Sequence, residues 1–123
     1  MFGPLAWYPI QYAAIYGVPV SLVRGIMRAE GWNPDRPTWE GNVREHSWGP
    51  MQILESTARG EGYVGPAEAL HEPRIGIKYG TKYLRSRLRR WGTCDAVSAY
   101  NAGRPISGNA AYVCRAAPFC RGC

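Results

Sequence analysis

The chain has 123 residues, of which 46% are hydrophobic and 20% charged, which excludes a disordered segment and leaves room for one globular domain with its own core. Its 15 Lys and Arg against 9 Asp and Glu give a formal charge of +6, which favours an anionic partner such as nucleic acid, an acidic membrane face or an acidic cell-wall polymer. The stretch before Arg24 is interrupted by prolines and has neither the charged start of a secretory signal nor a run long enough to span a bilayer.

The second predicted helix, Pro19–Glu30, combines an apolar face with an acid at its end. Glu30 falls on the same face as the apolar residues, and Gly31 follows at once and ends the helix. The acid is therefore either an ordinary helix-end glutamate turned to water or a carboxyl held at the lip of an apolar region. The face is defined by residues at three- and four-residue steps, Leu22, Val23, Ile26 and Met27.

Helices separated by Gly and Pro are also predicted for the rest of the chain, with no convincing alternating strand. We therefore predict a mainly α, compact fold with an irregular insert beside Glu30. The other predicted elements are, in chain order, a helix over Pro9–Tyr16, a loop over Gly31–Gly49 with room for a small hairpin within 36–48, short helical turns over Leu54–Arg59 and Pro66–Leu70, a basic helix over Arg74–Trp91, a helix that Thr93 caps and Gly103 ends, and a last helix from Ser107 or Asn109 to Pro118.

The basic helix contains much of the excess positive charge, in the stretch RSRLRRW from Arg85 to Trp91. A solvated helix face explains this stretch, and a dedicated anion-binding surface is the alternative.

Four cysteines, all in the last third of the chain, fit either disulfides or zinc. Their even number favours two disulfides and an oxidising compartment, and we expect Cys94 to pair with Cys114 because both lie in consecutive short helices that should pack together. The alternative is a zinc site, since Cys120 and Cys123 have the spacing of one ligand pair.

Three polar groups are not explained by packing alone: Glu30, the stretch SWGPMQI (47–53) and the stretch SAYNAG (98–103). Each has a simple structural explanation when taken singly, for instance a turn, or a helix end at which Asn101 bonds its own backbone. In this order, however, they resemble the soluble lytic transglycosylase family, whose fold is lysozyme-like and related to goose-type lysozyme. The matching residues, within the span 12–113, are Glu30, Gly49, Met51, Gln52, Ser56, Thr57, Ala58, Ile77, Gly80, Tyr83, Leu84, the stretch Ala99–Gly103, Tyr112 and Val113.

The chain departs from the family pattern at three positions. Gly31 stands where the family usually has serine, so a hydroxyl that would help orient the acid or the sugar is missing. Pro50 replaces a leucine before Met51 and should stiffen that turn, and Gly76 sits where the helix often has asparagine. We expect residues 1–123 to form one catalytic domain, with 117–123 as a short cysteine-containing tail.

The resemblance implies a peptidoglycan (murein) lytic transglycosylase that cleaves the β-1,4 bond between N-acetylmuramic acid and N-acetylglucosamine and leaves a 1,6-anhydro end. Glu30 would act first as general acid and then as base, with apolar neighbours disfavouring its charged form. No cofactor and no metal are expected. The candidate substrate-binding residues are Gln52, Tyr100 and Asn101 as hydrogen-bonding partners, Met51 and Tyr112 as lining, and Trp32, Trp39 and Trp48 as stacking rings.

Two alternatives remain open. One is a true hydrolase like goose-type lysozyme, in which Asp35, Glu40 or Glu45 would orient a water molecule. The other is a non-catalytic module that binds glycan, or nucleic acid through residues 85–90. For the main interpretation we expect the protein to act in the periplasm or cell wall, delivered by a phage particle or a secretion assembly, with its positive charge holding it near peptidoglycan.

Overall fold

Helices account for most of the computed structural model, which describes residues 4–31 and 47–123. The mainly α fold is thereby confirmed, and it is consistent with the lysozyme-like class. The elements are α1 (Pro4–Tyr16), α2 (Val20–Ala29), β1 (Ser47–Trp48), β2 (Ile53–Leu54), α3 (Glu55–Gly60), the 3-10 helix η1 (Ala67–His71), α4 (Pro73–Arg90), α5 (Thr93–Ala102) and α6 (Ala110–Ala116).

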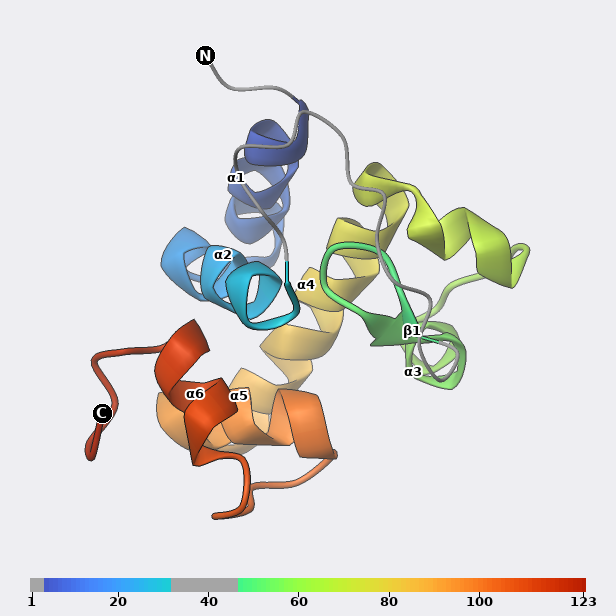
Figure 1. Cartoon of the computed structure of the whole chain (residues 1–123). Helices are drawn as coiled ribbons and strands as arrows, with labels where there is room; N and C mark the ends of the chain where they lie inside the picture. Colours follow the sequence, from blue (N-terminus) through green and yellow to red (C-terminus); the bar gives the residue numbers. More distant parts are fainter. Residues whose placement is uncertain (1–3, 32–46) are drawn as a thin grey trace.

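The long helix α4 runs through the middle of the molecule (Figure 1). Helices α1, α2, α5 and α6 lie on one side of it, and the hairpin, α3 and η1 lie on the other. Helix α2 packs directly on α6, and α4 packs on both α1 and α5. Segments from the two ends of the chain are therefore neighbours at the carboxyl end of α2.

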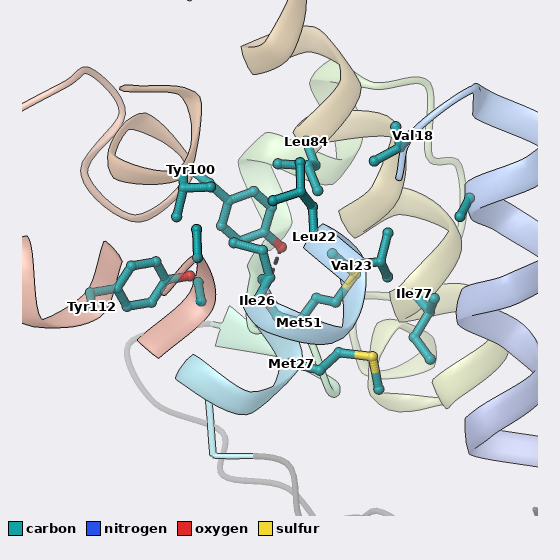
Figure 2. Close-up of a cluster of buried hydrophobic side chains, with 14 of the residues drawn as sticks. Val18, Leu22, Val23, Ile26, Met27, Met51, Ile77, Leu84, Tyr100 and Tyr112 are labelled. Atoms are coloured by element: carbon teal, nitrogen blue, oxygen red, sulfur yellow. Dashed lines mark hydrogen bonds between the residues drawn. The ribbon is translucent and has the colours of Figure 1, made fainter. Parts of the chain in front are cut away.

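The apolar face of α2 forms the centre of the main core, as its spacing predicts. Its four residues, Leu22, Val23, Ile26 and Met27, are all buried and pack in one cluster with residues from α4, α5 and α6. Figure 2 shows this cluster, with Tyr100 and Tyr112 reaching into it from α5 and α6. A second, smaller cluster under the hairpin contains Ile53, Ala58, Tyr63 and Leu70.

Two glycines allow close approaches that set the position of the elements around the carboxyl end of α2. A Cβ on Gly25 would lie 1.9 Å from the backbone oxygen of Ala116, so only glycine lets α2 and α6 come this close. A Cβ on Gly80 would lie 2.6 Å from the sulfur of Met51, so Gly80 makes room on α4 for the turn after β1.

The small hairpin is confirmed, with its first strand at the end of the range 36–48 and its second strand beyond it. Strands β1 and β2 are antiparallel, with Ser47 opposite Leu54 and Trp48 opposite Ile53. The turn between them is possible because Gly49 and Gln52 both take positive φ, at 76° and 47°, and the Gln52 amide donates to the Gly49 carbonyl over 3.0 Å. Most of the range 36–48 lies outside the described residues.

The predicted cap of α5 is also corrected. Gly92 is the N-cap, Thr93 is the first helical residue, and no side chain caps this end.

The cysteine pairing expected from the sequence is wrong. Disulfides join Cys94 to Cys120 and Cys114 to Cys123, with Cα atoms 5.9 Å and 5.4 Å apart. Although α5 and α6 do pack together, residues 117–123 lie close enough to both helices for the tail to supply one cysteine to each. The zinc alternative is wrong as well, since the four sulfurs form two disulfides and no cysteine is free to bind a metal.

None of the helices in the described ranges is both long and apolar enough to cross a membrane.

Candidate active site

A cleft of about 460 Å³ opens where the end of α2 meets the hairpin, α4 and the end of α5. Among the described residues that line it, Glu30 is the one with a charged side chain. The others are aromatic, apolar or neutral polar, a mixture that suits a neutral, hydroxyl-rich ligand such as a saccharide. The lining residues are Glu30, Ser47, Gln52, Ile53, Leu54, Thr57, Tyr83, Tyr100, Asn101, Ala102 and Gly103.

Glu30 lies at the lip of this cleft, as the phase of the apolar face indicates. It is the C-cap of α2, and its amide still donates to the Ile26 carbonyl over 2.9 Å. Its side chain is partly buried and faces the cleft. Gly31 then turns the chain with φ of 97°, a backbone conformation in which serine would be strained. This positive φ is therefore a local reason for glycine at position 31, where the family usually has serine.

Tyr112 of α6 fixes the carboxyl group of Glu30. Its hydroxyl donates a hydrogen bond of 2.8 Å to Oε2 of Glu30. Burial, and then the neighbouring charge of Glu30, raise the pKa of the Tyr112 phenol far above its ordinary value. The phenol therefore stays protonated and remains a donor to the carboxyl at every pH at which the protein would work.

Tyr100 of α5 lies beside this pair and lines the cleft, but its hydroxyl is used inside the protein. It donates to the Met51 carbonyl over 2.8 Å, and its ring packs on that of Tyr83 with centroids 5.2 Å apart. Burial, followed by the charge of Glu30, raises the pKa of Tyr100 well above its ordinary value. Tyr100 thus offers a ring face to the cleft and joins α5 to the turn of the hairpin.

Gln52 and Met51, which are adjacent in the sequence, have different places. Gln52 lines the cleft, and its Nε2 donates to the Gly49 carbonyl over 3.0 Å. Met51 is fully buried below the cleft and its sulfur accepts a bond of 3.8 Å from the Thr81 hydroxyl. The expectation that Met51 lines the groove is therefore wrong, because the left-handed backbone at Gln52 turns the two side chains to different sides.

Asn101 is exposed at the end of α5 and lines the cleft. Its Oδ1 accepts a hydrogen bond of 3.0 Å from Nδ2 of Asn109. The Asn101 side chain thus links the end of α5 to the start of α6, rather than bonding only its own backbone.

The other predicted site residues do not meet at the cleft in the described structure. Tyr112 reaches it only through Glu30, and Trp48 packs against the second apolar cluster under the hairpin. The remaining candidates, Trp32, Trp39, Asp35, Glu40 and Glu45, lie outside the described residues.

Sequence reasoning missed several lining residues, of which Tyr83 is the most informative. Tyr83 is one of the family-matching residues of the long helix, but it is not among the candidate site residues. Its position between Gly80 and Leu84, which are both buried, could have indicated that its phenol faces the interior of the fold. Ser47 and Thr57 also line the cleft and carry hydroxyl groups. Ser47 opens the stretch 47–53 and Thr57 is one of the matching residues, but neither is a candidate site residue, because only the packing of β1 and α3 brings them to the cleft.

Comparison with known proteins gives one family. The family model described as "Transglycosylase SLT domain" matches residues 8–112, which include every described residue that lines the cleft. No curated protein and no solved structure matches the chain.

Proposed function

The chain belongs to the transglycosylase SLT domain family, and from this premise we propose that it cleaves the β-1,4 bond between N-acetylmuramic acid and N-acetylglucosamine of peptidoglycan and leaves a 1,6-anhydro end. A peptidoglycan lytic transglycosylase function in general follows from the family, and the bond and the product are the proposal. The observation that supports it most is the carboxyl group of Glu30, the one acid among the described residues that line the cleft, which accepts a hydrogen bond from the phenol of Tyr112.

The first step of the proposed reaction uses Glu30 as general acid. Its proton goes to the glycosidic oxygen, the bond from that oxygen to the muramyl anomeric carbon breaks, and the N-acetylglucosamine side leaves as an alcohol. The positive charge left on the sugar is relieved when the carbonyl oxygen of its own N-acetyl group bonds to the anomeric carbon. The amide side chains of Gln52 and Asn101 line the cleft, and we propose them as the hydrogen-bonding partners of this part of the sugar.

The second step uses the same residue as base. The muramyl 6-hydroxyl attacks the anomeric carbon, its proton returns to Glu30, and the bond to the N-acetyl oxygen breaks. The 1,6-anhydro ring is closed, the N-acetyl group is restored and Glu30 is again protonated. Atoms balance without water, so one carboxyl group is sufficient for the whole cycle.

The proposed reaction needs only the one carboxyl group that the described part of the cleft provides. An inverting hydrolase needs a second carboxylate roughly 6.5–9.5 Å from the acid, so that a water molecule fits between them. Within residues 4–31 and 47–123, Glu30 is the one carboxylate that lines the cleft. A hydrolytic product would therefore point to an acid of the segment 32–46.

The disulfides support action outside the reducing cytoplasm. Two disulfides in a chain of this size are typical of proteins that work in an oxidising compartment such as the periplasm. This agrees with a peptidoglycan substrate.

A substitution of the acid tests the proposal. We expect Glu30→Gln to lower the rate of clearing of purified sacculi by at least about a hundredfold, as for the loss of a general acid. Glu68→Gln is the matched control, because Glu68 is exposed on η1 and does not line the cleft. Clearing at the parent rate by Glu30→Gln would exclude the proposed catalysis by Glu30. A parent protein that does not clear sacculi at all would favour the non-catalytic glycan-binding or nucleic-acid-binding module.

A further inference from the structure

Asn109 occupies a capping position without capping its helix. It is the N-cap residue of α6, where an asparagine side chain usually accepts a hydrogen bond from the first turn, yet it makes no such bond. Its amide faces α5 instead. Nδ2 donates to the Ser98 carbonyl over 3.1 Å and to Oδ1 of Asn101 over 3.0 Å.

Backbone groups fix which way the amide of Asn109 points. The Ser98 carbonyl can only accept, so the NH₂ group of Asn109 must face it. On the other side of the amide, the Ser98 hydroxyl accepts from the Ile106 amide over 2.9 Å and lies 2.8 Å from Oδ1 of Asn109. The hydroxyl can donate its own hydrogen either to this Oδ1 or to the Ile106 carbonyl, which lies 3.0 Å away, so the Ser98 carbonyl is the group that fixes the orientation of the Asn109 amide.

This order of donors and acceptors extends to the cleft. The same NH₂ group of Asn109 donates to Oδ1 of Asn101, so the carbonyl side of the Asn101 amide is engaged within the protein. Because an amide has its oxygen and nitrogen on opposite sides, the NH₂ group of Asn101 becomes the side presented to a ligand. An inverted Asn101 would place two NH₂ groups against each other and lose this bond.

From this arrangement we infer that Asn109 is a positioning residue that turns the donor side of Asn101 toward the cleft, where it binds an acceptor oxygen of the saccharide. The inference rests on the proposed function, because it concerns how the same cleft recognises glycan. The strongest acceptor on the sugar is the carbonyl of the 2-acetamido group, so N-acetylated sugars are the class that this arrangement selects.

Helix α6 consequently orients two groups of the site from two positions. Asn109 at its start holds Asn101, and Tyr112 one turn later holds Glu30.

A double-mutant cycle on ligand binding tests the inference. The probe is an oligomer of N-acetylglucosamine, with its N-deacetylated form for comparison, and binding is measured by titration calorimetry on Glu30→Gln protein so that nothing is cleaved. We expect Asn109→Ala to weaken binding of the acetylated oligomer roughly three- to tenfold, the range of one hydrogen bond, and to reduce the preference over the deacetylated form. In the presence of Asn101→Ala, Asn109→Ala should have no further effect.

The outcomes separate the inference from the proposed function. An equal loss in both backgrounds would show that Asn109 acts through the fold alone, and an unchanged affinity in Asn109→Ala would also overturn the inference. A protein that binds neither oligomer and does not clear sacculi would overturn the proposed function itself. Melting temperatures of all variants identify any loss that comes from unfolding. Asn109→Asp, which keeps the shape but cannot donate to Asn101, should weaken binding at least as much as Asn109→Ala.

Discussion

The hydroxyl of Tyr112 donates a 2.8 Å hydrogen bond to Oε2 of Glu30, although the two residues are 82 positions apart in the chain. The contact exists because α6 packs against α2, with Gly25 allowing the backbone of Ala116 to come close. The orientation of the proposed acid thus depends on the last helix of the chain. Two disulfides join α5 and α6 to the residues that follow α6.

Removing the hydroxyl of Tyr112 should affect catalysis more than binding. In Tyr112→Phe the carboxyl of Glu30 loses the hydrogen bond from the phenol, and a misplaced acid can lower a rate by up to about a hundredfold. We expect the turnover rate on sacculi to fall roughly tenfold or more, with little change in affinity for N-acetylglucosamine oligomers.

Tyr63→Phe is the matched control for this substitution. The Tyr63 hydroxyl donates to the Pro66 carbonyl over 2.6 Å, and the residue does not line the cleft. A fall in rate of the same size in Tyr63→Phe would mean that the loss of any buried phenol contact disturbs the site, which would contradict the role given to Tyr112.

The two phenols should make the protein sensitive to alkali. Burial, followed by the charge of Glu30, raises the pKa of both Tyr100 and Tyr112 in the folded state, whereas unfolded tyrosines ionise near pH 10. Above about pH 10 the folded state therefore binds more protons than the unfolded state, and a further rise in pH favours unfolding. This contribution to stability is complete below about pH 10 and is lost as the pH rises past it.

Thermal unfolding followed from about pH 8 to 11, the interval around the ordinary tyrosine pKa, measures this effect. The melting temperature of the parent should fall in the upper part of the interval, and the fall should be smaller in Tyr112→Phe. If the melting temperature falls with pH equally in the two proteins, Tyr112 is not protonated preferentially in the folded state.

The contact between α2 and α6 should not tolerate a side chain at position 25. A Cβ there would meet the Ala116 carbonyl at 1.9 Å, so Gly25→Ala forces the helices apart and should reduce the free energy of unfolding by about 1–3 kcal/mol or more. Because this shift also moves Tyr112 away from Glu30, activity should fall even at temperatures where the variant is folded. Gly60→Ala is the control, since a Cβ there meets nothing within 4 Å, and chemical denaturation should give it nearly the parent stability.

The disulfides should stabilise the end of the chain that holds the site. Removing one by a pair of serines typically costs about 2–5 kcal/mol in a small domain, and the larger effect is expected for Cys94–Cys120 because its loop is longer, with a separation of 26 residues against 9. Denaturation of each double-serine variant, under oxidising conditions, measures this. Peptide mapping that finds Cys94 linked to Cys114 would contradict the arrangement described here.

The sequence predicts those features of the fold that depend on local pattern. The apolar steps of α2 place Glu30 on the buried face, and Gly31 with its positive φ ends that helix where the spacing indicates. The ends of α5 and α6 are close to their predicted positions for the same reason, since Gly103 and Pro118 stop helices locally. The family resemblance adds the order of the motifs.

Features that depend on tertiary approach are not encoded in any short stretch. The pairing of Cys94 follows from the path of the last seven residues, which no periodicity describes. Met51 and Gln52 are turned to different sides by a left-handed backbone at a non-glycine residue, which a pattern of residue types does not reveal. The links from α6 to Glu30 and Asn101 likewise require knowledge of how α2, α5 and α6 pack.

The products of digestion in water enriched with a heavy oxygen isotope test the central claim most directly. Purified sacculi would be digested to completion with the parent protein and the muropeptides analysed by mass spectrometry. We expect muramyl ends that are lighter by one water than reducing ends and that contain no heavy oxygen, because the 6-hydroxyl of the same sugar closes the ring. Reducing ends that carry the heavy isotope would show that water attacks the sugar, which would contradict the account.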